Sequence, residues 1–160
     1  MKRTEKENYY LDIAETVLER STCLRRKYGA ILVLNDEIIA TGYNGAPRGR
    51  KNCDDLNYCT RESLNVPSGE RYELCRSVHA EANAIISAAR RDTLGSILYL
   101  VGRESVTDDY VEGTTPCTMC RRFIINAGIT KVICRVNKDT FSVTNVRDWV
   151  FNDDSLPTIL

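Results

Sequence analysis

Apolar residues recur at helical spacing near the start of the chain, and two short apolar runs follow. Residues 9–18 place five apolar side chains on one helical face, which predicts an amphipathic helix. These side chains are Tyr10, Ile13, Ala14, Val17 and Leu18. Residues 30–34 and 38–42 are partly β-branched and flank the turn-forming triplet 35–37, so they are predicted to form a β-hairpin.

The middle of the chain is irregular at first and then strongly patterned. Residues 42–75 contain many helix breakers and are predicted to be mainly loop. Residues 78–89 carry an apolar stripe at helical spacing, which predicts a buried helix that begins near His79. Residues 97–101 predict a strand buried on both faces, and the polar residues 102–113 predict a loop.

The last third of the chain predicts a helix, a strand and a second helix. Thr115 suits an N-cap, Pro116 the first helical position, and Gly128 the end of that helix. Residues 132–136 predict a strand, and residues 141–149 are amphipathic and predict a helix. This order of elements predicts one α/β domain over residues 1–160, a three-layer α/β/α sandwich with a central mixed sheet.

Charge and composition narrow the function classes. The chain has 22 basic and 22 acidic residues and a formal net charge of zero, so we expect a small-molecule substrate and no polynucleotide partner. No segment approaches the roughly 20 apolar residues of a membrane span, and the polar first ten residues lack a signal-peptide hydrophobic stretch. The seven cysteines are therefore expected to be metal ligands and core thiols in a cytoplasmic protein.

Two separated motifs carry the chemistry. One is His79-Ala80-Glu81, and the other is Pro116-Cys117-Thr118-Met119-Cys120. His79, Cys117 and Cys120 supply three zinc ligands, which leaves the fourth tetrahedral position to water. Glu81 is placed to move protons at this water. The pattern predicts a catalytic zinc site, and it resembles the signature of the zinc deaminases.

A structural zinc site is the alternative interpretation. Its fourth ligand would lie elsewhere in the chain, and Glu81 would be a solvated residue stabilised by the helix dipole. The conjunction of His-x-Glu, a proline before the cysteine pair, and both motifs at predicted helix starts favours the catalytic site.

Residues 23–132 resemble the deoxycytidylate (dCMP) deaminase family, which includes the bacterial deaminases encoded in competence operons. The motifs that carry the resemblance are Gly42-Tyr43-Asn44-Gly45-Ala46-Pro47-Arg48-Gly49, Pro67-Ser68-Gly69, His79-Ala80-Glu81-Ala82-Asn83-Ala84-Ile85, Pro116-Cys117-Thr118-Met119-Cys120 and Asn126-Ala127-Gly128-Ile129. The resemblance implies a cytidine deaminase-like fold and zinc-dependent hydrolysis of dCMP to dUMP, which supplies thymidylate synthesis. It also implies a homo-oligomer, often a hexamer, that in some members is activated by dCTP and inhibited by dTTP.

The glycine-rich loop after the second predicted strand has the features of a phosphate cradle. Gly42, Gly45 and Gly49 would let backbone amides approach an anion, and Arg48 and Arg50 would add charge. We therefore expect residues 45, 46 and 48 to bind the substrate. An ordinary glycine-rich turn with solvated arginines is the alternative. The basic run 25–27 either adds phosphate contacts or is a solvated face.

Further substrate residues follow from the resemblance. It implies that Asn44 contacts the deoxyribose or the base, that the backbone of Ala80 contacts the ring, and that Thr115 lines the pocket. The remaining substrate-binding residues of the predicted cradle are Gly45, Ala46 and Arg48.

Asn83, in the predicted helix 78–89, and Arg90, directly after it, are candidates for effector or interface contacts. Asn83 lies four residues after His79 and is expected to point toward the site from the same helical face. Arg90 is expected close to that face, where it would reach a neighbouring subunit or an effector nucleotide. A solvated arginine at the helix end is the alternative.

Four cysteines remain outside the catalytic pair and the predicted core. Some family members carry a second, structural zinc with ligands that match Cys23 and Cys53, and Cys59 and Cys75 would complete a four-thiolate site. Scattered free thiols are the alternative. Residues 102–113 make the chain longer here than family members usually are, and we expect them at the rim of the pocket.

Two other function classes stay open at this point. A tRNA adenosine deaminase shares the zinc signature, but a net charge of zero disfavours it. A zinc-stabilised module without turnover, acting in DNA uptake or assembly, is disfavoured by Glu81, because a purely structural site has no use for that carboxylate.

Overall fold

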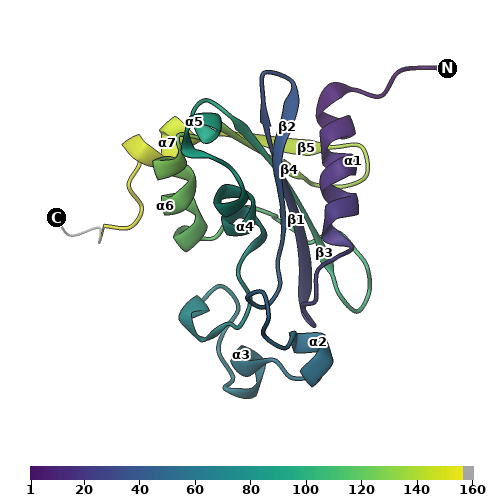
Figure 1. Ribbon diagram of the computed structural model, residues 1–160, viewed down its shortest axis with the longest axis vertical. Coiled ribbons are helices and arrows are strands. Elements are labelled where there is room, and N and C mark those ends of the chain that lie inside the picture. The colour runs from purple at the N-terminus through teal and green to yellow at the C-terminus, as the bar shows by residue number, and fades with distance from the viewer. Residues whose placement is uncertain (157–160) are drawn as a thin grey trace.

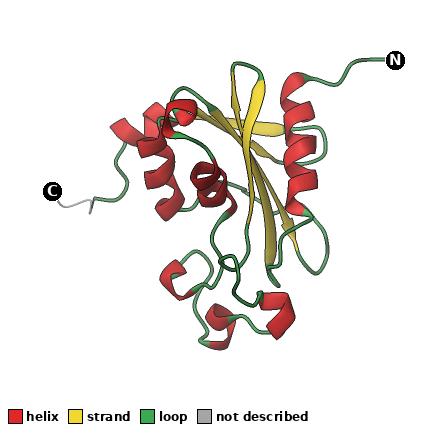
Figure 2. Cartoon of the chain, in the orientation of Figure 1, coloured by secondary structure: helices red, strands yellow, loops and turns green. Residues whose placement is uncertain are grey.

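The computed structural model describes residues 1–156, and its centre is a five-stranded sheet with helices on both faces (Figures 1 and 2). The strand order is β2-β1-β3-β4-β5. The strands are β1 (Arg26–Leu34), β2 (Glu37–Tyr43), β3 (Ile97–Glu104), β4 (Lys131–Arg135) and β5 (Phe141–Asn145). Only β3 and β4 pair in parallel among these neighbours, as expected for strands joined by a crossover helix. The predicted mixed sheet and layered α/β architecture are confirmed.

Helices cover the two faces unequally. Helix α1 (Lys6–Leu18) packs on one face against β1 and β3. Helix α4 (Ala80–Ser87) packs on the other face against β2 and β1, beside α6 (Thr118–Ala127). The short α5 (Arg90–Thr93) and α7 (Val146–Phe151) lie on the side of α6 (Figure 1).

The buried strands contribute alternate side chains to two separate cores, because successive residues of a strand point to opposite faces. Ala30 and Leu32 of β1 pack in the core on the side of α4 and α6, whereas Ile31 and Val33 pack with α1. Strand β3 divides in the same way, and its Leu98 and Leu100 are fully buried. The predicted strand buried on both faces is therefore confirmed.

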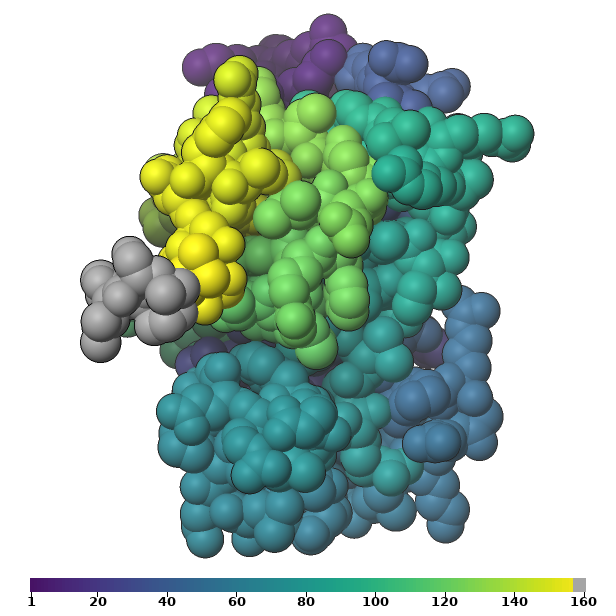
Figure 3. Space-filling view, turned by 90° about the vertical axis from the view of Figure 1, so that its left-hand side faces the viewer, coloured from purple at the N-terminus to yellow at the C-terminus, as the bar shows by residue number. Residues whose placement is uncertain are grey.

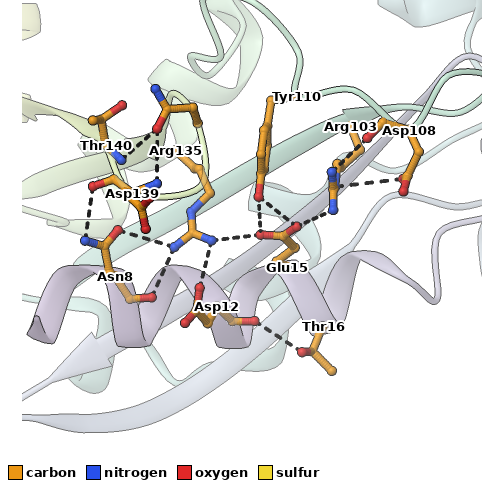
Figure 4. Close-up of polar contacts among 11 residues, drawn as sticks. Asn8, Asp12, Glu15, Thr16, Arg103, Asp108, Tyr110, Arg135, Asp139 and Thr140 are labelled. Atoms are coloured by element: carbon orange, nitrogen blue, oxygen red, sulfur yellow. Dashed lines mark hydrogen bonds and ion pairs between the residues drawn. The ribbon is translucent and has the colours of Figure 1, made fainter. Parts of the chain in front are cut away.

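An ion-pair network links α1 to strands β3 and β4 (Figure 4). The side chain of Arg135 in β4 is 1% exposed, and its Nη1 lies 2.8 Å from carboxylate oxygens of both Asp12 and Glu15. Glu15 also pairs with Arg103 at 2.6 Å and accepts a hydrogen bond from the Tyr110 hydroxyl at 3.1 Å. The network joins α1, β4 and the segment after β3.

The final segment differs from its prediction. Residues 141–145 form β5, which pairs antiparallel with β4, and only then does α7 begin at Val146. The predicted helix over 141–149 is therefore wrong in its first half. The run Phe-Ser-Val-Thr-Asn alternates with a period of two and contains the β-branched Val143 and Thr144, which suits an edge strand.

Three other element boundaries also differ. Helix α4 ends at Ser87, because Ala88 has an extended backbone with ψ of 155°. Helix α6 begins at Thr118 and not near Pro116, so the predicted N-cap at Thr115 is wrong. Strand β3 continues to Glu104 because it pairs along its whole length with β1, whose Arg26 lies opposite Glu104.

Residues between β2 and α4 form an irregular segment with short helices, as predicted. These are α2 (Cys53–Leu56), α3 (Thr60–Ser63) and the 3-10 helix η1 (Tyr72–Leu74). In the space-filling view the segment lies below the face formed by α6 (Figure 3). Within residues 1–156, no helix is long and apolar enough to cross a bilayer.

Candidate active site

The starts of α4 and α6 bring the two sequence motifs together. His79 is the N-cap of α4, and Cys117 is the N-cap of α6, where its sulfur accepts a hydrogen bond from the Cys120 backbone amide at 3.4 Å. The His79 Nδ1 atom lies 3.5 Å from the Cys117 sulfur and 3.4 Å from the Cys120 sulfur. The predicted convergence of these three side chains is therefore observed.

The three side chains fit a tetrahedral zinc ion. Their ligand atoms lie within 4.8 Å of one another, and residues 1–156 contain no other such group of three or more His, Cys, Asp or Glu side chains. Zinc–sulfur and zinc–nitrogen bonds of about 2.3 and 2.0 Å at a tetrahedral angle place sulfur and nitrogen about 3.5 Å apart. The observed separations agree with that value, and three protein ligands leave one position open.

The protein groups alone give the thiols of Cys117 and Cys120 opposite pKa shifts. A hydrogen bond from the Cys120 thiol, together with one from His79, lowers the pKa of Cys117 to about 4. The same bond raises the pKa of Cys120, because its proton is held by the Cys117 anion. Burial lowers the pKa of His79, but hydrogen bonds to Cys117 and Cys75 outweigh it and raise the pKa to about 10. A divalent cation among these groups would stabilise two thiolates and a neutral imidazole.

Glu81 is buried beside the three metal-ligating groups. It lies in the first turn of α4, its residue is 5% exposed, and burial raises the pKa of its carboxyl against the opposing charge of His79. A solvated position, which the structural alternative required, is therefore excluded. A buried carboxyl with a raised pKa suits a group that accepts and returns protons.

A cavity of about 120 Å³ opens in front of these groups. Its lining includes His79, Glu81 and Cys117, and also the predicted substrate residues Asn44, Ala80 and Thr115. The sequence analysis missed other lining residues, among them Tyr28, Arg61 and Tyr72. The Tyr72 ring meets the His79 ring edge-on, with centroids 4.7 Å apart. Nothing in the local pattern of the irregular segment distinguishes Arg61 and Tyr72 from solvated residues.

Asn44 is held rigidly at the cavity wall. Its Oδ1 accepts hydrogen bonds from the Tyr28 amide at 2.8 Å and the Ser21 hydroxyl at 2.5 Å, and its Nδ2 donates to the Arg26 carbonyl at 2.9 Å. One N–H of the amide remains for a ligand after these bonds. Direct substrate contacts by Asn44, Ala80 and Thr115 stay predictions.

The predicted phosphate cradle is wrong for Gly45, and Gly42 has a packing role. A Cβ at position 42 would lie within 3.0 Å of the α4 backbone, so this glycine serves the packing of β2 against α4. The Gly45 amide donates to the Val78 carbonyl at 3.3 Å and is not free to hold an anion. Ala46 and Arg48 are absent from the cavity lining, as is Gly45, and Arg48 is exposed. The arginines that do line the cavity are Arg25, Arg26 and Arg61.

Asn83 and Arg90 lie elsewhere than predicted. The Asn83 side chain donates to the Tyr43 carbonyl at 2.8 Å, so it ties α4 to the end of β2 and is absent from the cavity lining. Arg90 does not continue the face of α4, because that helix ends at Ser87 and Arg90 begins α5. It lines a separate apolar groove with Ile86 and others, and an effector or interface role there stays a prediction.

The four remaining cysteines gather around one buried thiol. Cys53 is buried, which raises its pKa, and the nearby thiols of Cys23, Cys75 and Cys59 raise it further. Their sulfurs do not form a group at ligand spacing in the described chain. Cys23, Cys59 and Cys75 line the same cavity as His79.

The segment 102–113 does not form the cavity rim as predicted, since none of its residues is in the lining. It folds back on itself through a bridge between Arg103 and Tyr110 and buries Val111. Tyr110 bonds Glu15 of α1, so the segment belongs to the opposite side of the sheet.

Comparisons with known proteins agree with this site. A family model described as the cytidine and deoxycytidylate deaminase zinc-binding region matches residues 4–136. The deoxycytidylate deaminase of Mycobacterium phage D29 is 38% identical over 138 residues, which cover 83% of this chain and 96% of the phage protein. The deoxycytidylate deaminase of Schizosaccharomyces pombe is 34% identical over 128 residues, which cover 79% of this chain but only 36% of the yeast protein.

A solved structure is also similar. The dCMP deaminase of cyanophage S-TIM5 in apo form has a TM-score of 0.58 and 30% identity, with 84% of this chain and 85% of that chain covered. Its complex with dCMP and dUMP has a TM-score of 0.56 and 28% identity, with 84% of each chain covered.

Proposed function

This chain belongs to the cytidine and deoxycytidylate deaminase family, and from that premise we propose that it hydrolyses dCMP to dUMP and ammonia. One observation carries the proposal: the buried Glu81 carboxyl lines one cavity with His79 and Cys117, which form a metal-ligand group together with the buried Cys120. This arrangement provides both a hydrolytic metal centre and a group that moves protons.

The roles of the residues follow from this geometry. His79, Cys117 and Cys120 would hold a zinc ion, which would supply the Lewis-acid chemistry that makes water nucleophilic near neutral pH. Glu81 accepts a proton from the attacking water and gives it to the ring nitrogen beside the reacting carbon. It then accepts the second proton of the water from the added hydroxyl and passes it to the leaving amine as the carbon–nitrogen bond breaks, so that dCMP and water yield dUMP and ammonia.

The charge of the cavity supports an anionic substrate. Arg25, Arg26 and Arg61 line it, although the chain as a whole is neutral. Arginine guanidinium groups are well matched to phosphate oxygens. A nucleotide therefore suits the cavity better than a free nucleoside, and the named relatives act on deoxycytidylate.

A substrate panel tests the proposal. Ammonia release would be measured from dCMP, CMP, deoxycytidine, dCTP and a tRNA stem-loop that carries adenosine. We expect the highest kcat/KM with dCMP, and one dUMP for each ammonia. No release from any cytosine compound, or faster release from the stem-loop, would overturn the proposal.

Several finer features are part of the proposal. A second zinc held by Cys23, Cys53, Cys59 and Cys75 is supported by the clustering of these thiols around buried Cys53. A homo-oligomer such as a hexamer, regulation by dCTP and dTTP, and a cytoplasmic location follow from the resemblance and the composition and stay predictions.

A further inference from the structure

Arg61 is a buried charge without an acidic partner. It lies in α3, within the irregular segment, and is 7% exposed. Within residues 1–156, no carboxylate forms an ion pair with its guanidinium. Burying a charge is costly unless an opposite charge or several hydrogen bonds compensate it, so a bound anion would stabilise this arrangement.

Neutral groups hold Arg61 in a fixed orientation. Its Nε donates to the Glu70 carbonyl at 3.0 Å, and its Nη2 donates to the Pro67 carbonyl at 2.9 Å. The guanidinium lies over the Tyr72 ring, 4.4 Å from the centroid. The third nitrogen, Nη1, makes no hydrogen bond with the described part of the chain and is not enclosed by it. Since Arg61 lines the cavity, this nitrogen is available to a ligand there.

The other two cavity arginines are less suited to fixing an anion. Arg26 is exposed and already pairs with Glu104 at 3.0 Å. Arg25 is half-buried and has no hydrogen bond or ion pair that orders its guanidinium within residues 1–156. A side chain that is already ordered loses less entropy when it binds, which favours Arg61.

We propose that Arg61 binds the 5′-phosphate of the substrate and so makes the enzyme select a nucleotide over a nucleoside. The inference rests on the proposed function, because it assigns one residue of that cavity to one group of dCMP. Tyr72 connects the two ends of the cavity, with Arg61 over its face and the His79 ring against it. The irregular segment thus supplies the phosphate end, and α4 and α6 supply the reacting end.

The test compares Arg61→Gln and Arg61→Lys with the wild-type protein on dCMP and deoxycytidine. Loss of a charged hydrogen bond to phosphate lowers kcat/KM for dCMP by roughly 10- to 100-fold in R61Q, and by less in R61K. The value for deoxycytidine should fall far less, so the preference for the nucleotide shrinks. Arg71→Gln is the matched control, because Arg71 is exposed in the same segment and, within residues 1–156, pairs only with Glu73. It should keep the wild-type preference.

An equal loss of kcat/KM for both substrates in a folded Arg61 variant would overturn the assignment, since that result is expected if Arg61 only stabilises the fold. Zinc content and melting temperature identify folded variants, and R61K decides the question if R61Q does not fold. Calorimetric binding of dCMP and deoxycytidine separates the two proposals. If the wild type binds dCMP more tightly and R61K loses this preference while no substrate is turned over, the proposed function fails and the phosphate assignment stands.

Discussion

Substitution of Gly42 by alanine should damage catalysis through the backbone of α4. A Cβ at position 42 would lie within 3.0 Å of the Ala80 carbonyl oxygen, the Ala84 nitrogen and the Asn83 carbonyl carbon. These are helix backbone atoms that no side-chain rotation can move away. The helix must therefore shift by roughly 1 Å, and overpacking of this kind costs about 3 kcal/mol of unfolding free energy.

The shift matters because α4 carries both His79 and Glu81. A misplacement of about 1 Å at reacting groups costs on the order of 100-fold in rate. We therefore expect G42A to lose about 100-fold in kcat on dCMP while it remains folded at low temperature. The assay is ammonia release at substrate saturation, together with urea unfolding and zinc content.

Gly29→Ala provides the matched control on the opposite face of the sheet. Its Cβ would press equally closely on the α1 backbone, at the Ala14 carbonyl oxygen and, at 2.6 Å, the Leu18 nitrogen. Helix α1 carries no residue of the candidate site, so G29A should lose similar stability but little kcat. Equal loss of kcat in the two variants, or full kcat in G42A, would refute the reasoning.

Two further predictions concern stability. Arg135→Met should lower the unfolding free energy by about 2 kcal/mol. This loss is smaller than that expected when a buried carboxylate loses its sole partner, because Arg103 still pairs with Glu15 in the variant. An unchanged urea midpoint would contradict this prediction. Tyr10→Phe should weaken the acid dependence of stability, because the hydrogen bond from Tyr10 lowers the pKa of Asp36. The stability gained from ionised Asp36 is present above its ordinary pKa of 3.8 and is lost as the pH falls through its lower pKa in the folded protein. If the unfolding free energy of Y10F and wild type depends on pH identically between about pH 5 and 2, the prediction is wrong.

The reacting end of the site was predictable from sequence because its constraints are local. The ligand atoms lie at the first residues of two helices, and each motif is a short string whose chemistry needs fixed residue types. The sheet layers were predictable for a similar reason, since the apolar runs of β1 and β3 are long and bounded by turns. Strand β5 was missed because its alternating run is only five residues long and leads directly into a helix, and three of the five residues are exposed.

The arginine-lined end of the cavity was not predictable because its residues are placed by contacts that leave no local sequence pattern. The amide of Gly45 is used by Val78, which no local pattern shows. Arg61 resembles any exposed arginine in the sequence, and its burial arises from carbonyl groups several residues later and from the Tyr72 ring. The prediction for Arg90 failed because α4 ends before Ala88, whereas the apolar stripe in the sequence continues past this residue.

Bound zinc and dCMP deamination, measured together in three proteins, test the central claim most directly. Wild type should contain zinc and release ammonia, and His79→Ala should lose the catalytic zinc and the activity. Glu81→Gln should keep that zinc but lose turnover, because only the proton-moving group is gone. Undiminished zinc and ammonia release in H79A, or full turnover in E81Q, would contradict the account.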